Sequence, residues 1–106
     1  MSLPLVTAVA PRWDGTVARV AGSTSGVHLA RRCADVAELV GVAAAGLARV
    51  AVVSSDLRGL DRSIVDRLRA EGVAVVGLHP PGDQDAARRL ARWRVPVVLP
   101  ADLTVE

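Results

Sequence analysis

The sequence contains no lysine, no phenylalanine and no tyrosine, and it has one cysteine and two tryptophans. All 13 basic residues are therefore arginines. Without lysine, the chain cannot carry the phosphate-binding lysine of a P-loop or a lysine that forms a Schiff base with a substrate. The single cysteine, Cys33, cannot form a disulfide within the chain, which is typical of a protein of the reducing cytoplasm. These absences exclude several classes of enzyme.

Long apolar runs are absent as well. No uncharged stretch reaches the ~18–20 residues that a helix needs to span a bilayer. Residues 1–4 carry no basic side chain ahead of the short apolar run that follows, so the sequence predicts no secretory signal peptide. We therefore expect a cytoplasmic protein that does not insert into a membrane.

The composition indicates one folded domain. The chain has 106 residues, of which 51% are hydrophobic and 23% are charged. Its core must consist mainly of valine, alanine and leucine, because large aromatic side chains are scarce. The formal net charge of +2 does not require a polyanionic partner.

Short apolar runs alternate with amphipathic segments along the whole chain. Two of the runs, at 50–53 and 73–76, are continuous and rich in valine, as in buried parallel sheets. Asp35, Asp61 and Asp83 precede segments with helical spacing, and we expect them to cap helices. The expected strands are 5–10, 27–33, 50–53, 73–76 and 95–99, and the expected helices are 13–21, 35–45, 61–72 and 83–93.

This alternation predicts an α/β fold built from right-handed βαβ units. Five strands fit a flavodoxin-like, doubly wound parallel sheet with the strand order 2-1-3-4-5. Residues 101–106 are acidic and follow a proline, like the start of a helix. We therefore expect the final helix of the fold to be missing or incomplete.

Polar residues follow the third and fourth expected strands, at the edge where sheets of this kind bind ligands. Ser54, Ser55 and Asp56 follow the third strand and His79 follows the fourth, so these four residues form a candidate pocket. Segment 50–61, an apolar strand followed by Asp56 and a short loop, resembles the receiver domain of response regulators. The resemblance makes Asp56 a candidate phospho-acceptor.

Phosphoryl transfer to Asp56 needs partners that the sequence lacks. A receiver holds Mg²⁺ with an acidic pair after its first strand, and it stabilises the phosphoryl group with a hydroxyl and a lysine. Here the first expected strand ends in Ala10, Pro11 and Arg12, and Pro100 lies near the place of the lysine. We therefore expect that Asp56 is not phosphorylated in the usual way and acts as a hydrogen-bond acceptor.

Other interpretations of the pocket remain open. A small ligand or nucleotide could bind at the carboxyl ends of the strands near Ser54 and Asp56. A hydrolase triad of serine, His79 and Asp56 is disfavoured, because no G-x-S-x-G elbow is present. The two histidines and Cys33 lack the spacing of metal ligands, so the sequence predicts no metal site and no cofactor.

Segment 83–94 carries a basic patch, which consists of Arg88, Arg89, Arg92 and Arg94. Arg88, Arg89 and Arg92, together with Trp93, lie on one expected helix and form a candidate protein interface. The alternative is a solvated helix face. The absence of lysine and of aromatic stacking platforms argues against nucleic acid as the partner.

Segments 31–39, 54–61 and 82–86 together resemble the N-terminal domain of actinobacterial septum-site-determining proteins. Those proteins are similar to CpaE-like pilus-assembly proteins of the MinD/ParA ATPase superfamily. The resemblance implies that residues 1–106 are a single pseudo-receiver domain that precedes an ATPase domain of the same polypeptide. It also implies a non-catalytic role in regulation or localisation, exerted through contacts with that ATPase domain or with a second copy.

Overall fold

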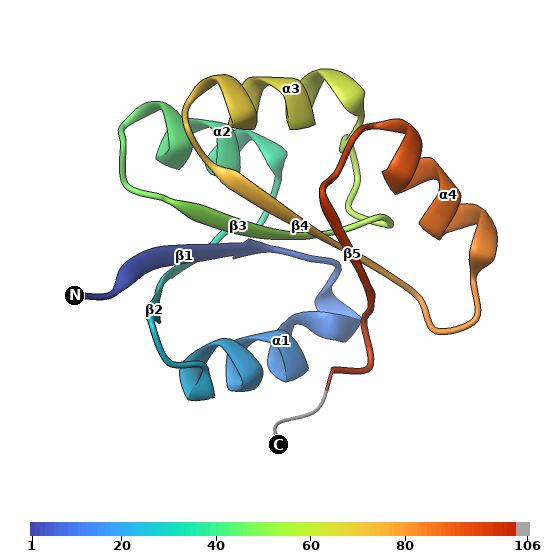
Figure 1. Ribbon diagram of the computed structural model, residues 1–106, viewed down its shortest axis with the longest axis horizontal. Helices are drawn as coiled ribbons and strands as arrows, with labels where there is room; N and C mark the ends of the chain where they lie inside the picture. The colour runs from blue at the N-terminus through green and yellow to red at the C-terminus, as the bar shows by residue number, and fades with distance from the viewer. Residues whose placement is uncertain (104–106) are drawn as a thin grey trace.

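Five parallel strands form the centre of the computed structural model, which describes residues 1–103 (Figure 1). They pair in the order β2-β1-β3-β4-β5, so the expected flavodoxin-like topology is confirmed. The bounds of the strands are β1 (Leu3–Ala8), β2 (Val27–Arg32), β3 (Val50–Ser54), β4 (Ala74–His79) and β5 (Val97–Pro100).

Four helices connect the strands, and their bounds are α1 (Pro11–Ser23), α2 (Val36–Ala44), α3 (Arg62–Ala70) and α4 (Gln84–Arg92). The three expected caps are confirmed. The side chains of Asp35, Asp61 and Asp83 accept hydrogen bonds of 2.8, 3.0 and 2.9 Å from the backbone N–H groups three residues further on. Within residues 1–103, no helix is long and apolar enough to cross a membrane.

Helices α2, α3 and α4 end in the same backbone motif, in which one residue adopts a positive φ. That residue is Gly46 after α2 (φ 75°), Gly72 after α3 (φ 79°) and Arg94 after α4 (φ 63°). After α4, the N–H of Arg94 donates to the Ala91 carbonyl and the N–H of Val95 donates to the Leu90 carbonyl. The same two bonds close α2 and α3.

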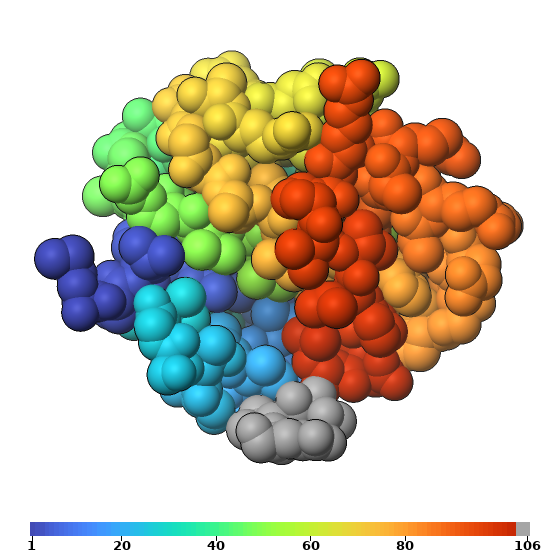
Figure 2. Space-filling view, viewed as in Figure 1, coloured from blue at the N-terminus to red at the C-terminus, as the bar shows by residue number. Residues whose placement is uncertain are grey.

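The two faces of the sheet are covered unequally. Helices α2, α3 and α4 lie on one face, where Leu39, Leu68 and Leu90 are fully buried (Figure 1). Helix α1 alone lies on the other face, packed over β1 and β2. Val97 and Leu99 of β5 expose 44% and 39% of their surface, and Figure 2 shows no helix over this strand. Part of the second face therefore presents apolar side chains to solvent.

The structure differs from the sequence prediction at five places. Strand β1 spans Leu3–Ala8 rather than 5–10, and β4 continues to His79, through three residues that were expected to follow the strand. Helix α1 begins at Pro11 and continues to Ser23, through two residues that were expected in a loop. Strand β5 begins at Val97 rather than at Val95, because the N–H of Val95 closes the end of α4. Residues 101–103 form no helix, and residues 104–106 of the expected final helix lie outside the described part of the chain.

Candidate functional site

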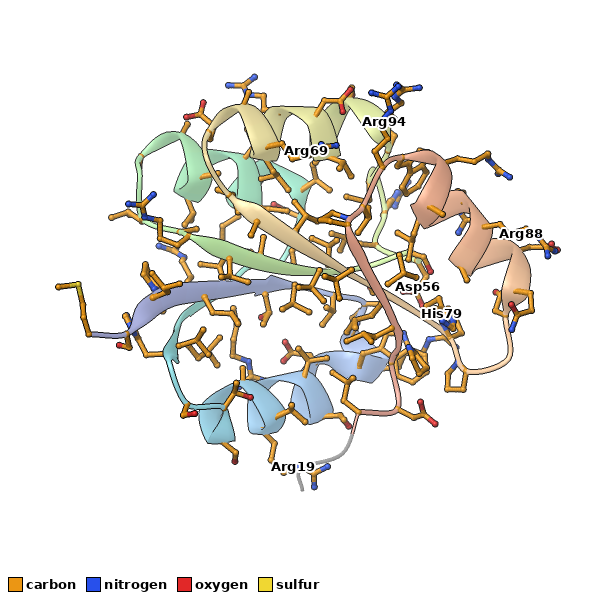
Figure 3. The ribbon with its side chains drawn as sticks, viewed as in Figure 1. Arg19, Asp56, Arg69, His79, Arg88 and Arg94 are labelled. Carbon is orange, nitrogen blue, oxygen red and sulfur yellow. The ribbon has the colours of Figure 1, made fainter. Side chains whose placement is uncertain are left out.

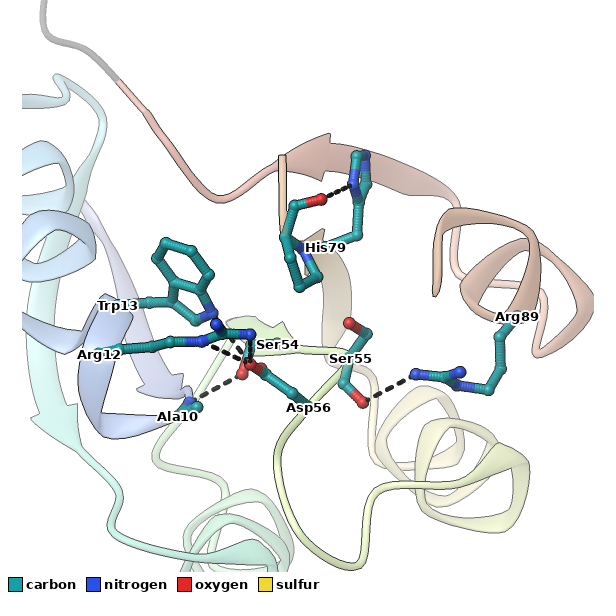
Figure 4. Close-up of polar contacts among 9 residues, drawn as sticks. Ala10, Arg12, Trp13, Ser54, Ser55, Asp56, His79 and Arg89 are labelled. Atoms are coloured by element: carbon teal, nitrogen blue, oxygen red, sulfur yellow. Dashed lines mark hydrogen bonds and ion pairs between the residues drawn. The ribbon is translucent and has the colours of Figure 1, made fainter. Parts of the chain in front are cut away.

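Asp56 lies just after β3, at the carboxyl edge of the sheet, and its carboxylate is held by the first turn of α1 (Figure 4). One oxygen, Oδ2, accepts hydrogen bonds from Arg12 Nε at 3.0 Å, Arg12 Nη2 at 2.7 Å and Trp13 Nε1 at 3.1 Å. The Arg12 guanidinium also lies over the Trp13 ring, 4.5 Å from its centroid. The three side chains therefore form one cluster, in which a single cation neutralises Asp56.

The Ser54 side chain fixes the start of α1 relative to the end of β3. Ala10 precedes α1 and makes no side-chain cap, while Pro11 occupies the first helical position. The backbone N–H of Ala10 donates to the Ser54 hydroxyl at 2.8 Å, and Ser54 is fully buried. This bond ties the start of α1 to the end of β3, so Arg12 and Trp13 are carried to Asp56 by the backbone.

The pKa of Asp56 is lowered from its ordinary value. Partial burial of the carboxyl raises the pKa, but the hydrogen bonds from Arg12, Ser54 and Trp13 outweigh that effect. The Asp56 side chain is 26% exposed, against 58% for Arg12. Asp56 is therefore ionised near neutral pH, and Arg12 of the same chain supplies its counter-charge.

Ser55 and His79 occupy the same edge but make other contacts. The Ser55 carbonyl accepts a hydrogen bond of 3.4 Å from Arg89 Nη2, which reaches over from α4 (Figure 4). Its hydroxyl is buried and has no hydrogen-bond partner within residues 1–103. His79 Nδ1 lies 2.8 Å from the Pro80 carbonyl, and because a carbonyl can only accept, this nitrogen carries the proton.

Of the four residues of the candidate pocket, Ser54 and Asp56 interact, because a hydrogen bond from Ser54 contributes to the lowered pKa of Asp56. The Ser55 hydroxyl and the His79 ring make no hydrogen bond to Asp56 in the described chain. Sequence reasoning missed Arg12 and Trp13 as site residues. The signal that could have found them is Pro11, because a proline that opens a helix at a strand end puts the next two side chains at the carboxyl edge. The functional roles of the four pocket residues remain predictions.

A second polar feature lies beside α1, on the side of β2. The carboxylate of Asp14 forms an ion pair with Arg32. Both belong to the wall of a cavity of about 320 Å³, which is lined by Val9, Pro11, Asp14, Arg32, Cys33 and Ala34. Burial of the Cys33 thiol raises its pKa to about 11, so this sulfur is a buried thiol rather than a nucleophile.

The residues present at the Asp56 edge do not fit Mg²⁺. Magnesium needs several oxygen ligands, with carboxylates as its usual protein donors. Asp56 is already occupied by Arg12, and Asp14 is paired with Arg32. Residues 1–103 contain no group of three histidine, cysteine, aspartate or glutamate side chains placed to hold a metal ion.

The candidate interface on α4 divides into two parts. Arg88 and Arg92 are exposed, and Arg88 pairs with Asp85 on the same helix at 2.6 Å. Trp93 is half-buried against the core, and the guanidinium of Arg89 lies 5.7 Å from the centroid of its ring. Only Arg88 and Arg92 of the four predicted residues thus face solvent fully.

No protein-family profile matches this chain, and no curated protein matches it by sequence. Its structure is similar to the signal receiver domain of the response regulator NarL from Mycobacterium tuberculosis, with a TM-score of 0.79, 17% identity and coverage of 97% of this chain and 86% of that one. It is also similar to the isolated receiver domain of RcsB from Salmonella enterica serovar Typhimurium, solved with the phosphomimetic BeF3⁻ (TM-score 0.76, 9% identity, 98% and 80% coverage).

A third similar structure is a pilus assembly-related protein from Burkholderia pseudomallei, with a TM-score of 0.73 and 16% identity. That match covers 98% of this chain and 81% of the other. Identities this low establish the fold alone. The chain therefore has the fold of response-regulator receiver domains.

Proposed function

We propose that this chain is a non-catalytic, receiver-like regulatory domain that acts through protein contacts. The observation that carries the proposal is the Arg12–Asp56 pair, in which an arginine of the chain itself takes the carboxylate that a receiver would present to a phosphoryl donor. A carboxylate bound in this way is a poorer nucleophile, because its charge is already neutralised.

The surroundings of Asp56 support the same proposal. Phosphoryl transfer to a carboxylate requires positive charge that stabilises the transferred group rather than the attacking carboxylate. Arg12 and Trp13 both donate to Oδ2, and Pro100, at the end of β5, offers no cation. With no lysine in the chain, no other residue supplies the missing charge in the usual way.

The contact surface in this proposal is the outer side of α4, where Arg88 and Arg92 are exposed. The domain would be the N-terminal part of a longer cytoplasmic protein with a CpaE- or MinD-like ATPase domain, acting in septum-site determination or in pilus assembly. Two features support this placement: the sequence resemblance and the structural similarity to a pilus assembly-related protein. The exposed apolar side chains of β5 would then be covered by a following segment or by a second copy.

The test is treatment of the purified chain with acetyl phosphate and Mg²⁺, followed by intact-mass measurement. We expect no phosphate adduct on the parent chain. A Mg²⁺-dependent adduct that disappears in Asp56→Asn would contradict the proposal and make the domain a phosphorylation switch. Arg12→Ala is the informative companion, because an adduct seen only in this variant would show that Arg12 blocks the carboxylate.

The second candidate function is a small-ligand or nucleotide sensor at the same edge. The Ser55 hydroxyl favours it, because a buried hydroxyl without a protein partner within residues 1–103 calls for a water molecule or a ligand atom that bonds to it. A nucleotide that raises the thermal midpoint of the parent, but not that of Ser55→Ala, would support this function over the first.

A further inference from the structure

The amino edge of the sheet, opposite Asp56, carries two arginines that lie side by side. Arg69 Nη1 donates a hydrogen bond of 3.1 Å to the backbone carbonyl of Arg94. Figure 3 shows the two residues next to each other, at the ends of α3 and α4. We call them the Arg69–Arg94 pair.

The backbone at Arg94 does not favour an arginine. Every other residue with a positive φ within residues 1–103 is a glycine, and Gly46 and Gly72 hold the same position in the motifs that end α2 and α3. An L-residue with a side chain is strained in this conformation, and glycine is not. The backbone motif therefore does not favour an arginine at position 94, and a role for this residue would rest on its side chain.

The Arg69–Arg94 pair also has no counter-charge of its own. Within residues 1–103, neither guanidinium has a carboxylate within 4.0 Å, which is also true of Arg19, Arg49, Arg58, Arg67, Arg89 and Arg92. What sets the pair apart is the contact of the Arg69 side chain with residue 94. Both residues are exposed. Stabilisation of the helix dipoles does not require Arg94, because Arg69 and Arg92 already lie in the last turns of α3 and α4.

We infer that the Arg69–Arg94 pair is a docking point for a protein segment that carries carboxylates. A guanidinium has five N–H donors, and only one of the donors of Arg69 is used by the carbonyl of residue 94. The remaining N–H donors of each guanidinium lie in one plane and can bind a carboxylate through two parallel hydrogen bonds. Because Arg69 contacts the backbone of residue 94, the guanidiniums of these two neighbouring residues suit two carboxylates spaced a few residues apart.

Nucleic acid fits this edge less well than an acidic protein segment. A phosphate backbone carries closely spaced charges and binds best along an extended basic surface. Here Glu71 caps the end of α3, two residues from Arg69, and it is exposed. A protein segment can place its carboxylates on the two guanidiniums and keep an uncharged residue opposite Glu71, whereas a continuous phosphate chain cannot. This inference does not depend on the proposed function, because Asp56 lies at the other edge of the sheet.

The experiment titrates a fluorescein-labelled oligoglutamate peptide with the chain and follows anisotropy at low ionic strength. We expect binding to the parent that weakens with added salt. Arg94→Gly should weaken it about tenfold, the usual effect of one charge-assisted contact. Because glycine suits the backbone at this position, the variant should unfold no earlier than the parent, so a loss of binding cannot be ascribed to misfolding.

Arg19→Ala is the matched control, since Arg19 is exposed and lies on the opposite side of the molecule (Figure 3). It removes one positive charge and should leave the affinity within about twofold. Equal losses in Arg94→Gly and Arg19→Ala would reduce the effect to net charge and overturn the inference. Absence of peptide binding to the parent would overturn it too. A single-stranded oligonucleotide that binds more tightly than the peptide and is equally sensitive to Arg94→Gly would replace the protein partner by nucleic acid.

Discussion

The two edges of the sheet both carry arginines, but they use them in opposite ways. At the carboxyl edge, Arg12 is bound to Asp56 and lies over Trp13. At the amino edge, Arg69 contacts only the backbone of Arg94, and neither side chain has a carboxylate partner within residues 1–103. Asp56 is therefore neutralised by Arg12 of the same chain, whereas the Arg69–Arg94 pair has N–H donors that no carboxylate of residues 1–103 uses.

The carboxyl edge is the place where a receiver does its chemistry. The amino edge is the place where we propose that this chain binds a partner. A carboxylate that is neutralised by its own chain needs no external cation. A pair of exposed guanidiniums, by contrast, gains free energy mainly when an external anion arrives. The measurements below change one edge at a time, in order of decreasing expected effect.

The largest effect is expected at the carboxyl edge from Ser54→Ala. The Ser54 hydroxyl accepts from the Ala10 N–H, so its removal leaves that partly buried donor without its partner. We expect the free energy of unfolding to fall by about 2 kcal/mol, measured by urea denaturation. Ser55→Ala is the control, because its hydroxyl has no partner to lose and should cost less than about 0.5 kcal/mol. Equal costs for the two serines would contradict the role given to Ser54.

A smaller loss is expected at the amino edge from Gly72→Ala. No atom lies within 4 Å of a Cβ added at Gly72, so its φ of 79° is the only source of strain. We expect the free energy of unfolding to fall by about 1 kcal/mol. Gly22→Ala adds the same methyl group at a residue without a positive φ and should not destabilise the chain.

Arg94→Gly should shift stability in the other direction. It removes the strain at φ 63° but adds freedom to the unfolded chain, so we expect a net gain of about 0.5 kcal/mol. Thermal denaturation of the parent and the variant measures this gain. A loss of stability would mean that the Arg94 side chain contributes to folding, and its presence would then need no partner.

The smallest effect is expected from Asp56→Asn, and it should depend on pH. The pKa of Asp56 is lower in the folded chain than its ordinary value of 3.8. The stabilisation by the charged form is therefore complete above that value and is lost as the pH falls through the folded pKa. We expect the variant to be less stable than the parent at pH 7 by less than about 0.5 kcal/mol, because solvent screens the exposed Arg12. The difference should disappear in strong acid.

The fold could be predicted because its signals are local. Continuous valine-rich runs predict buried parallel strands, and Asp35, Asp61 and Asp83 predict helix starts through contacts within three residues. The contacts of the site are long-range. Arg12 and Asp56 are 44 residues apart in the chain, and their pairing depends on where α1 begins. Pro11 signals that start, but the bond between Ala10 and Ser54, which ties the start of α1 to β3, has no pattern in the sequence.

Arg94 shows the same limit at the other edge. In the sequence, Gly46 and Gly72 indicate where α2 and α3 end, but Arg94 does not indicate the end of α4. The buried contact between Val95 and the end of α4 selects the conformation, and the sequence alone does not show that arginine adopts it. Packing likewise decides that two of the four predicted interface residues are half-buried. Trp93 lies against the core, and Arg89 donates to the carbonyl of Ser55, just after β3.

The buried thiol of Cys33 can serve as a reporter of local opening of the folded chain. Its backbone N–H donates to the Thr7 carbonyl at the junction of β1 and β2, and Cys33 is only 6% exposed, in the wall of the cavity beside α1. Alkylation at this position should therefore be slow in the folded chain and faster when the junction opens, so its rate reports on that opening. Because the chain has no other cysteine, the signal comes from one place and needs no engineered label.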